Sequence, residues 1–322
     1  MTTRYAVRTE HLSKTYRLGK ENVVQAVIDV GLGIEPGQVF GFLGPNGAGK
    51  TTTLKMVCGL VRPSSGSAWI NGQDVWRHRS AAASQIGAVL EGERNTHWEI
   101  PALDNVLWFG MLRGISGRRL RIRAEDLLRQ VELWDRRKDL VREFSRGMKQ
   151  KLSVACALVA DPPVLLLDEP TLGLDVQAAR AIKAMIKRLA ADEGRTVILT
   201  THEMKLAEEL CDRVAIISRG RIIADQPVSE LLDLFAQEHY EIVVEGQLQE
   251  VIPVGLEGIK LAQRNGHSVL SGPLLDQGHL YRVLDHLRQS RLPLLSVNRA
   301  DPDLEEVFVR LLDGDAKKGV EQ

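Results

Sequence analysis

Residues 44–52 of this chain read Gly-Pro-Asn-Gly-Ala-Gly-Lys-Thr-Thr, a stretch that few folds can accommodate. It fits the pattern Gly-x-x-x-x-Gly-Lys-[Ser/Thr], follows an apolar run at residues 39–43 and precedes a helix-compatible stretch at residues 52–60. A strand, a loop and a helix in this order form a phosphate-binding loop. The stretch therefore predicts an α/β fold that binds a nucleotide. The alternative is a glycine-rich turn without a ligand.

The residue types in this loop suit phosphate binding. Its glycines let the backbone turn N–H groups toward the β- and γ-phosphate oxygens, and the helix N-terminus adds a positive dipole end. Lys50 supplies a charge to the same oxygens, Thr51 offers a hydroxyl to Mg²⁺, and Thr52 is a further donor to phosphate. The predicted nucleotide-binding residues of the loop are Gly44, Pro45, Asn46, Gly47, Ala48, Gly49, Lys50, Thr51 and Thr52.

Two acids end a second apolar run. Residues 163–167 have the continuous apolar pattern of a strand in a parallel sheet covered on both faces, and Asp168 and Glu169 follow it. Ligands of open α/β sheets bind at the carboxyl ends of the strands. We therefore expect Asp168 to hold the Mg²⁺ and Glu169 to polarise the water that attacks the γ-phosphate. The alternative is a strand end with two solvated acids.

With three further segments, the chain resembles the ATP-binding subunits of ABC transporters over about residues 3–235. Phe-Ser-Arg-Gly-Met at residues 144–148 stands where this family has its signature Leu-Ser-Gly-Gly-Gln. Gly-Leu-Asp at residues 173–175 resembles the D-loop of the family, and Thr-Thr-His at residues 200–202 resembles its switch-histidine segment. Tyr16 stands at the place of the aromatic residue that stacks on adenine.

Three of these residues have other interpretations when taken alone. Tyr16 is compatible with an ordinary strand tyrosine, His202 with a structural histidine and Ser145 with a plain helix N-cap. The resemblance implies instead that Tyr16 stacks on adenine, that His202 senses the γ-phosphate, and that Ser145 and Gly147 contact nucleotide. For Ser145 both roles can hold together, because a helix N-terminus also attracts phosphate.

The sequence departs from the family pattern at three positions. Arg146 replaces the first signature glycine, Met148 replaces the glutamine, and Glu91 stands where the Q-loop glutamine is expected. A glutamate can bind Mg²⁺ through oxygen but cannot donate as an amide does. Similar variants occur in drug and polyketide exporters of the daunorubicin-resistance type. The departures therefore favour that subfamily, with Glu91 as a candidate metal contact.

The resemblance implies a P-loop NTPase fold. We expect an ABC ATP-binding domain at residues 1–235, with an antiparallel β region and a helical subdomain at about residues 92–160. The sequence pattern predicts strands of the β region at residues 5–9 and 23–30, with a turn at residues 18–20. Apolar spacing of three and four predicts helices at residues 102–112 and 124–133 of the subdomain. Residues 236–313 alternate strand and helix patterns, which predicts a small accessory α+β domain of ferredoxin-like type. The resemblance implies a role of this domain in dimerisation or regulation. The tail at residues 314–322 is expected to be flexible.

Composition limits the partners. The chain has 322 residues with 42 basic and 42 acidic side chains, so no net charge points to nucleic acid. Cys58, Cys156 and Cys211 are widely spaced in apolar patterns, which favours buried thiols over a disulfide or zinc site. The start of the chain does not resemble a signal peptide, and its apolar stretches are shorter than a membrane span. A transport pore would therefore belong to another polypeptide.

Two groups are candidates for contact with such a partner. Trp98, Trp108 and Phe109 could form the groove that receives a coupling helix, and simple core packing is the alternative. The arginines in the run at residues 118–123 could face lipid headgroups or an acidic partner, although a solvated helix face is the favoured interpretation.

The mechanism that we predict uses a homodimer in which two head-to-tail subunits enclose two ATP molecules. Lys50, Glu169 and His202 are the predicted catalytic residues; Thr51, Asp168 and Glu91 hold Mg²⁺; Ser145 and Gly147 reach across from the other subunit. The dimer would lie at the cytoplasmic face of the membrane and drive the export of drugs or other amphipathic small molecules by a membrane permease. The alternatives are a polysaccharide exporter, an importer or a soluble ABC ATPase on ribosome or DNA.

Overall fold

The computed structural model describes residues 5–18, 22–92, 95–236, 239–248, 259–264, 266–273, 277–289, 292–299 and 303–318. They divide into two compact units, one of residues 1–227 with 311–322 and the other of residues 228–310. Within the described ranges, no helix has the length and apolar character needed to cross a bilayer.

A six-stranded sheet is the centre of the first unit. Its strand order is β10 (Arg221–Pro227), β9 (Arg213–Ser218), β3 (Val39–Leu43), β8 (Thr196–Thr201), β7 (Val164–Asp168) and β6 (Ile86–Val89). All neighbours from β9 to β6 are parallel, while β10 is antiparallel to β9. Both runs expected as buried strands are confirmed, since every residue of β3 and β7 is buried. The parallel order brings the segments after β3, β7 and β8 to one edge.

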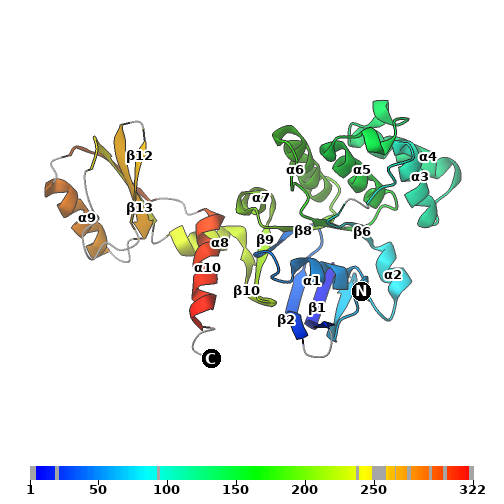
Figure 1. The fold of residues 1–322 in the computed structure, drawn as a ribbon, viewed down its shortest axis with the longest axis horizontal. Helices are drawn as coiled ribbons and strands as arrows, with labels where there is room; N and C mark the ends of the chain where they lie inside the picture. Colours follow the sequence, from blue (N-terminus) through cyan, green and yellow to red (C-terminus); the bar gives the residue numbers. More distant parts are fainter. Residues whose placement is uncertain are drawn as a thin grey trace. The chain divides into compact units, whose positions relative to one another are not determined.

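Helices cover the sheet on both faces. Figure 1 shows α6 (Val176–Ala191) and α7 (Met204–Leu210) on one side, and α1 (Lys50–Val57) on the other. Phe40 and Phe42 of β3 and Leu166 of β7 share a core with Leu54 and Met56 of α1. This double cover explains why β3 is apolar throughout and why β7 is apolar up to Asp168 at its end.

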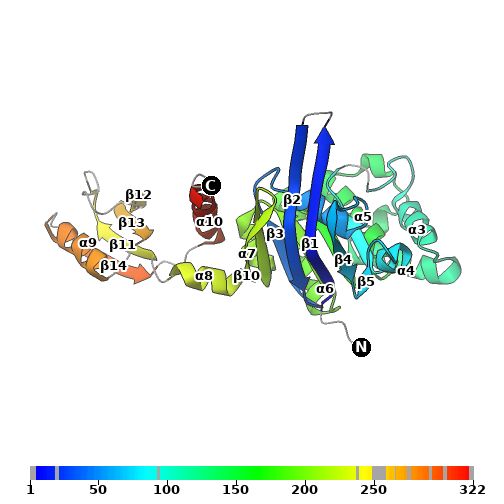
Figure 2. The same cartoon turned by 90° about the horizontal axis from the view of Figure 1, so that it is seen from below.

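A four-stranded antiparallel sheet forms the expected β region. Its order is β2 (Asn22–Ile34), β1 (Val7–Leu18), β4 (Ser65–Ile70) and β5 (Gln73–Asp74), and Figure 2 shows β1 and β2 as a long pair. The sequence predicted shorter strands at residues 5–9 and 23–30. β-Bulges between Thr9 and Thr15 shift the register of β1 against β2. The two strands therefore stay paired beyond the point where the alternation of apolar and polar residues ends. The turn expected at residues 18–20 lies largely outside the described residues.

The helical subdomain is confirmed as three main helices. These are α3 (Ala102–Leu112), α4 (Gly117–Gln130) and α5 (Arg146–Leu158), with short 3₁₀ turns at Trp134–Arg136 and Val141–Glu143. Leu120, Ala124, Leu127 and Leu128 form the buried stripe of α4. The spacing of three and four positions at residues 124–133 predicted part of this stripe, but the helix begins earlier, at Gly117, and Leu120 lies outside the predicted range. A short helix, α2 (Arg79–Ser84), precedes the subdomain.

The second unit is an α+β module. Its antiparallel sheet has the order β12 (Lys260–Arg264), β13 (His267–Pro273), β11 (His239–Glu245) and β14 (Leu294–Arg299). Val283 and Leu287 of α9 (Gln277–Gln289) pack on Ile242, Val244 and Leu270. β12 and β13 were not predicted from the sequence, and β12 offers only one large apolar residue.

The ends of the second unit differ from the expected domain limits. α8 (Val228–Ala236) begins the second unit, although the expected boundary at residue 235 would group it with the ATP-binding domain. α10 (Leu304–Lys318) continues to Lys318, so residues 314–318 are helical where a flexible tail was expected. The division at Arg310 and Leu311 falls within α10. Residues 319–322 lie outside the described residues.

Candidate nucleotide-binding site

The glycine-rich loop connects β3 to α1 and is held between two strands. A Cβ added to Gly44 would overlap the carbonyl oxygen of Ile217 in β9. Gly49 has φ +113, and a Cβ there would lie 2.5 Å from the carbonyl oxygen of Ala26 in β2. A side chain at either position would force the loop away from these strands. Close backbone packing thus places the loop at the carboxyl end of β3.

The side chain of Lys50 binds the backbone of this loop. Its Nζ donates to the carbonyl oxygens of Gly44 at 2.6 Å and Pro45 at 3.2 Å, and only 6% of the residue is exposed. Burial lowers the pKa of Lys50, against the opposing effect of the Glu169, Asp168 and Glu91 carboxylates. A buried cation at the N-terminus of α1 suits a polyanionic ligand such as a triphosphate.

Asp168 is fixed by three donors at the end of β7. Thr51 Oγ1 donates to its Oδ1 at 3.3 Å, Thr200 Oγ1 donates to the same oxygen, and the backbone N–H of Glu91 donates to Oδ2 at 3.3 Å. The residue is 3% exposed. The structure therefore brings together Thr51, Asp168 and the backbone of Glu91, as the sequence predicted for a metal site, while the Glu91 residue itself is exposed.

Oxygen ligands of this kind fit Mg²⁺. The Thr51 hydroxyl and the Asp168 carboxylate are neighbouring hard oxygen donors at the mouth of the phosphate loop. Mg²⁺ prefers one or two protein oxygens, with substrate phosphate oxygens and water completing the octahedron. The donor set on this chain therefore fits the ion together with a nucleotide.

Glu169 and His202 form a second pair beside Asp168. His202 Nδ1 lies 2.9 Å from Glu169 Oε1, and the backbone N–H of Glu169 donates to Thr200 Oγ1 at 3.1 Å. Glu169 has φ 48, in the left-handed region that a non-glycine residue seldom adopts. Such backbone conformations cluster at functional sites, where the surrounding structure maintains them. The geometry turns the carboxylate toward the histidine.

Thr200 is a site residue whose role the sequence analysis missed. Its hydroxyl donates to Asp168 and accepts from the backbone N–H of Glu169, so one side chain orients both acids. It is fully buried. Its place in the sheet could have indicated this role, because β8 lies next to β7 and Thr200 pairs with Asp168 in their parallel register.

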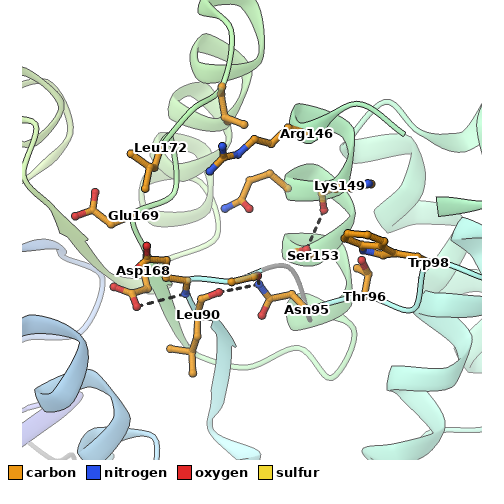
Figure 3. Close-up of a pocket in the computed structure, with 14 residues that line it drawn as sticks. Leu90, Asn95, Thr96, Trp98, Arg146, Lys149, Ser153, Asp168, Glu169 and Leu172 are labelled. Atoms are coloured by element: carbon orange, nitrogen blue, oxygen red, sulfur yellow. Dashed lines mark hydrogen bonds between the residues drawn. The ribbon is translucent and has the colours of Figure 1, made fainter. Parts of the chain in front are cut away.

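A pocket of about 330 Å³ opens between these acids and the helical subdomain (Figure 3). Glu91, Asp168 and Glu169 line one part of it, and Arg146 and Lys149 of α5 line another. Acids and cations thus face the same space. The remaining lining residues are Leu90, Gly92, Asn95, Thr96, Trp98, Gln150, Ser153, Leu172 and Leu174.

The signature residues Ser145 and Gly147 lie elsewhere. Ser145 caps α5, since its Oγ accepts from the backbone N–H of Met148 at 3.3 Å. A Cβ on Gly147 would lie 2.5 Å from the Cβ of Ala178 in α6. Both residues line a second pocket of about 370 Å³ with Asp175, and of the described residues that line it none comes from the phosphate loop. Within one chain, the signature residues Ser145 and Gly147 therefore do not share this pocket with the phosphate loop.

Tyr16 lies on β1, as expected. It pairs with Val24 of β2, is half-buried, and has the Nζ of Lys14 5.0 Å from its ring centroid. No pocket described above includes Tyr16. Its role toward adenine therefore stays a prediction.

The aromatic group and the arginine run, the two candidates for partner contact, are each partly engaged in contacts within the chain. Trp108 and Phe109 meet edge to face at 4.9 Å between ring centroids, and Lys149 Nζ lies 4.0 Å from the Trp98 ring centroid. Arg123 pairs with Asp161 at 3.0 Å. The other arginines of the run, Arg118, Arg119 and Arg121, are exposed.

Two segments of the chain match known protein families. Residues 27–172 match the family model described as "ABC transporter". Residues 239–298, in the second unit, match a domain of unknown function.

Two drug-resistance relatives cover nearly the whole chain, and an export relative covers about two thirds of it. The daunorubicin/doxorubicin resistance ATP-binding protein DrrA of Streptomyces peucetius is 32% identical, over 95% of this chain and 92% of that protein. The linearmycin resistance ATP-binding protein LnrL of Bacillus subtilis is 32% identical, over 95% and 97%. A Nod factor export ATP-binding protein of Cupriavidus metallidurans is 41% identical, over 64% and 68%.

Solved structures share the fold. A dimeric post-hydrolysis state of the ATP-binding cassette MJ0796 bound to ADP and Pi aligns with TM-score 0.63 and 27% identity, over 69% of this chain and 98% of that one. The cbiO1 protein of Clostridium perfringens, part of an ABC transporter complex, aligns with TM-score 0.65 and 25% identity, over 72% and 92%.

Proposed function

The chain belongs to the ATP-binding subunits of ABC transporters and is an ATPase, and we propose that its ATP hydrolysis drives export of drugs or other amphipathic small molecules through a separate membrane permease. The drug-resistance relatives support this substrate class. They align over 95% of the chain and so include most of the second unit, whereas the Nod factor export relative covers 64%.

The observation that carries the proposed chemistry is the meeting of three segments at one sheet edge. Lys50 follows β3, Asp168 and Glu169 end and follow β7, and His202 follows β8. In our proposal the loop residues and Lys50 bind the phosphates, and Tyr16 stacks on adenine. This binding keeps the γ-phosphate close to the two acids.

Glu169 accepts a proton from the attacking water in this proposal. The hydrogen bond with His202 orients the carboxylate, and His202 is also placed to contact the γ-phosphate. Lys50 stabilises the charge that gathers on the phosphate oxygens. Thr51, Asp168 and Glu91 would hold Mg²⁺, which supplies neutralising charge to the β- and γ-phosphates when bound.

A second copy of the chain completes the site. Ser145 and Gly147 line a pocket without loop residues, so we propose that they meet the nucleotide of a partner subunit in a head-to-tail homodimer. The capped N-terminus of α5 then points at the γ-phosphate, which a helix dipole favours. Closure depends on the γ-phosphate touching both subunits, and hydrolysis releases it.

The proposed location is the cytoplasmic face of the membrane, bound to the permease. The surface around Trp98 and Trp108 is the proposed contact for a coupling helix of that permease. Trp108 is 37% exposed, which leaves part of its ring available.

One experiment tests the proposal. The chain is purified from its native membranes in mild detergent together with any membrane protein that binds it, and ATP hydrolysis is measured with amphipathic drugs and with oligosaccharides. We expect drugs to raise turnover, and Glu169→Gln to bind ATP while lowering turnover by at least about 100-fold. Stimulation by oligosaccharides alone would favour the polysaccharide-exporter alternative. Failure to co-purify a membrane protein, or unchanged turnover in the variant, would contradict the proposal.

A further inference from the structure

Consecutive residues at the start of α5 face two different pockets. Ser145 and Gly147 line the pocket that contains Asp175, whereas Arg146, between them, lines the pocket that contains Glu169. Successive residues of a helix point about 100° apart, so one turn can present side chains in both directions. The first turn of α5 therefore touches both halves of the ATP site.

The guanidinium of Arg146 packs on the segment that follows Glu169. A Cβ added to Gly173 would overlap Nη1 and lie 2.6 Å from Cζ of Arg146. Gly173 also has φ +68, so it lacks a side chain for two reasons. Figure 3 shows Arg146 pointing from α5 toward the segment that carries Leu172.

That segment is connected directly to Glu169. The backbone N–H of Leu172 donates to the carbonyl oxygen of Glu169 at 3.2 Å, and the N–H of Leu174 donates to that of Thr171 at 3.2 Å. These two successive turns make residues 169–174 a compact unit. A displacement at Gly173 is therefore passed to the backbone of Glu169, which is held in a left-handed conformation.

The placement of Arg146 is not explained by helix stability. A cation in the first turn of a helix is opposed by the helix dipole. The carboxylates of Glu91, Asp168 and Glu169 line the same pocket and attract the guanidinium instead. The side chain thus joins α5 to the turn after Glu169 by packing and by charge.

We propose that Arg146 is a positioning residue that couples the two ATP sites of the dimer. The inference rests on the proposed function, because Ser145 and Gly147 meet a nucleotide only in the head-to-tail dimer. When a partner's γ-phosphate engages these two residues, the first turn of α5 shifts and Arg146 moves residues 172–174. The general base Glu169 of the same subunit is thereby adjusted for the other ATP.

The test is the ATP dependence of hydrolysis by the full-length chain. Wild type should be cooperative, with a Hill coefficient above 1 and at most about 2 for two sites. Arg146→Gly should lower it to about 1 and reduce kcat, while Arg146→Lys, which keeps length and charge, should retain most of the cooperativity. Lys149→Ala is the matched control, because Lys149 lines the same pocket three positions further along α5 and packs on Trp98.

Gly173→Ala tests the contact from its other side. The added methyl group displaces the guanidinium, so this variant should also lose cooperativity, and Arg146→Gly/Gly173→Ala should lose no more than either single variant. Retained cooperativity in Arg146→Gly would overturn the inference, as would equal loss in Lys149→Ala. A Hill coefficient of 1 in wild type, with Glu169→Gln inactive, would overturn it and leave the proposed function standing. Normal hydrolysis in Glu169→Gln would instead contradict the proposed function.

Discussion

His202 Nδ1 lies 2.9 Å from Glu169 Oε1, so the residues that follow two neighbouring parallel strands form one hydrogen-bonded pair. The glutamate side chain is 10% exposed and the histidine side chain 42%. The pair therefore joins a shielded carboxylate to a ring that is open to ligand.

Replacing His202 should slow hydrolysis without preventing ATP binding. His202→Ala removes the group that orients Glu169, and we expect kcat to fall about 100-fold while the Kd for ATP changes little. Steady-state turnover and equilibrium binding of a fluorescent ATP analogue measure the two quantities. Glu203→Gln, at the next exposed position, is the control. A His202→Ala protein with more than half of the wild-type kcat would show that the pair has no part in the reaction.

Ser145 allows its structural and functional roles to be separated. Ser145→Ala removes the N-cap of α5 and should lower the free energy of unfolding by about 1 kcal/mol. Ser145→Asp keeps a cap but places negative charge where we propose that the γ-phosphate binds. This variant should therefore unfold like wild type in urea and yet hydrolyse ATP poorly. Full activity in Ser145→Asp would refute the proposed phosphate contact.

Gly49 and Gly47 should differ sharply in their tolerance of a methyl group. Both have positive φ, which costs about 1–2 kcal/mol for alanine, but a Cβ on Gly47 meets nothing within 4 Å. A Cβ on Gly49 meets the carbonyl oxygen of Ala26 at 2.5 Å. Gly49→Ala should thus destabilise the chain clearly more than Gly47→Ala in urea unfolding. Equal losses would mean that the loop can move away from β2.

Asp161 should make folding stability depend on acid pH. Its carboxylate accepts hydrogen bonds from Arg195 and Arg123. The hydrogen bond from Arg195, together with the positive charges of Arg195 and Arg123, holds the pKa of Asp161 below its usual value. The folded state thus binds fewer protons, so the stabilisation is present above the ordinary pKa of about 3.9 and is lost as the pH falls through the lower folded value.

Asp161→Asn tests this dependence without disturbing the backbone, since Asp161 has φ 59 and asparagine tolerates that region. We expect a loss of about 1 kcal/mol or less at pH 7, and convergence with wild type toward pH 2, in urea unfolding. Asp192→Asn, at an exposed position, should change stability little at either pH. A difference that stays constant with pH would exclude the ion pair as its cause.

The sheet was well predicted where burial alone determines the sequence. β3 is apolar throughout, and β7 is apolar up to Asp168, because both faces of the sheet are covered. The limits of both strands followed from their apolar runs to within one residue. The limits of β1 depended on bulges, which have no clear sequence pattern. β12 was missed because a strand such as Lys260–Arg264 depends on its neighbours rather than on its own residues.

The motifs indicate which residues are candidates for the site, but they do not indicate the contacts between them. Lys50, Asp168, Glu169 and His202 could be named from motifs, and the structure brings them to one edge. That Thr200 orients both acids depends on strand register, which the motif does not state. The direction of the Arg146 side chain depends on how α5 begins. The replacement of a signature glycine by arginine does not by itself predict this direction.

The packing of the phosphate loop on Ile217 has a consequence for synthesis of the chain. β3 pairs with β8 and β9, strands that the ribosome adds long after the loop itself. Such distant pairings form slowly, because loop closure must precede any gain from contact. A nascent chain that stops short of β9 should therefore lack ATP affinity, and its apolar β3 would be left for chaperones to shield.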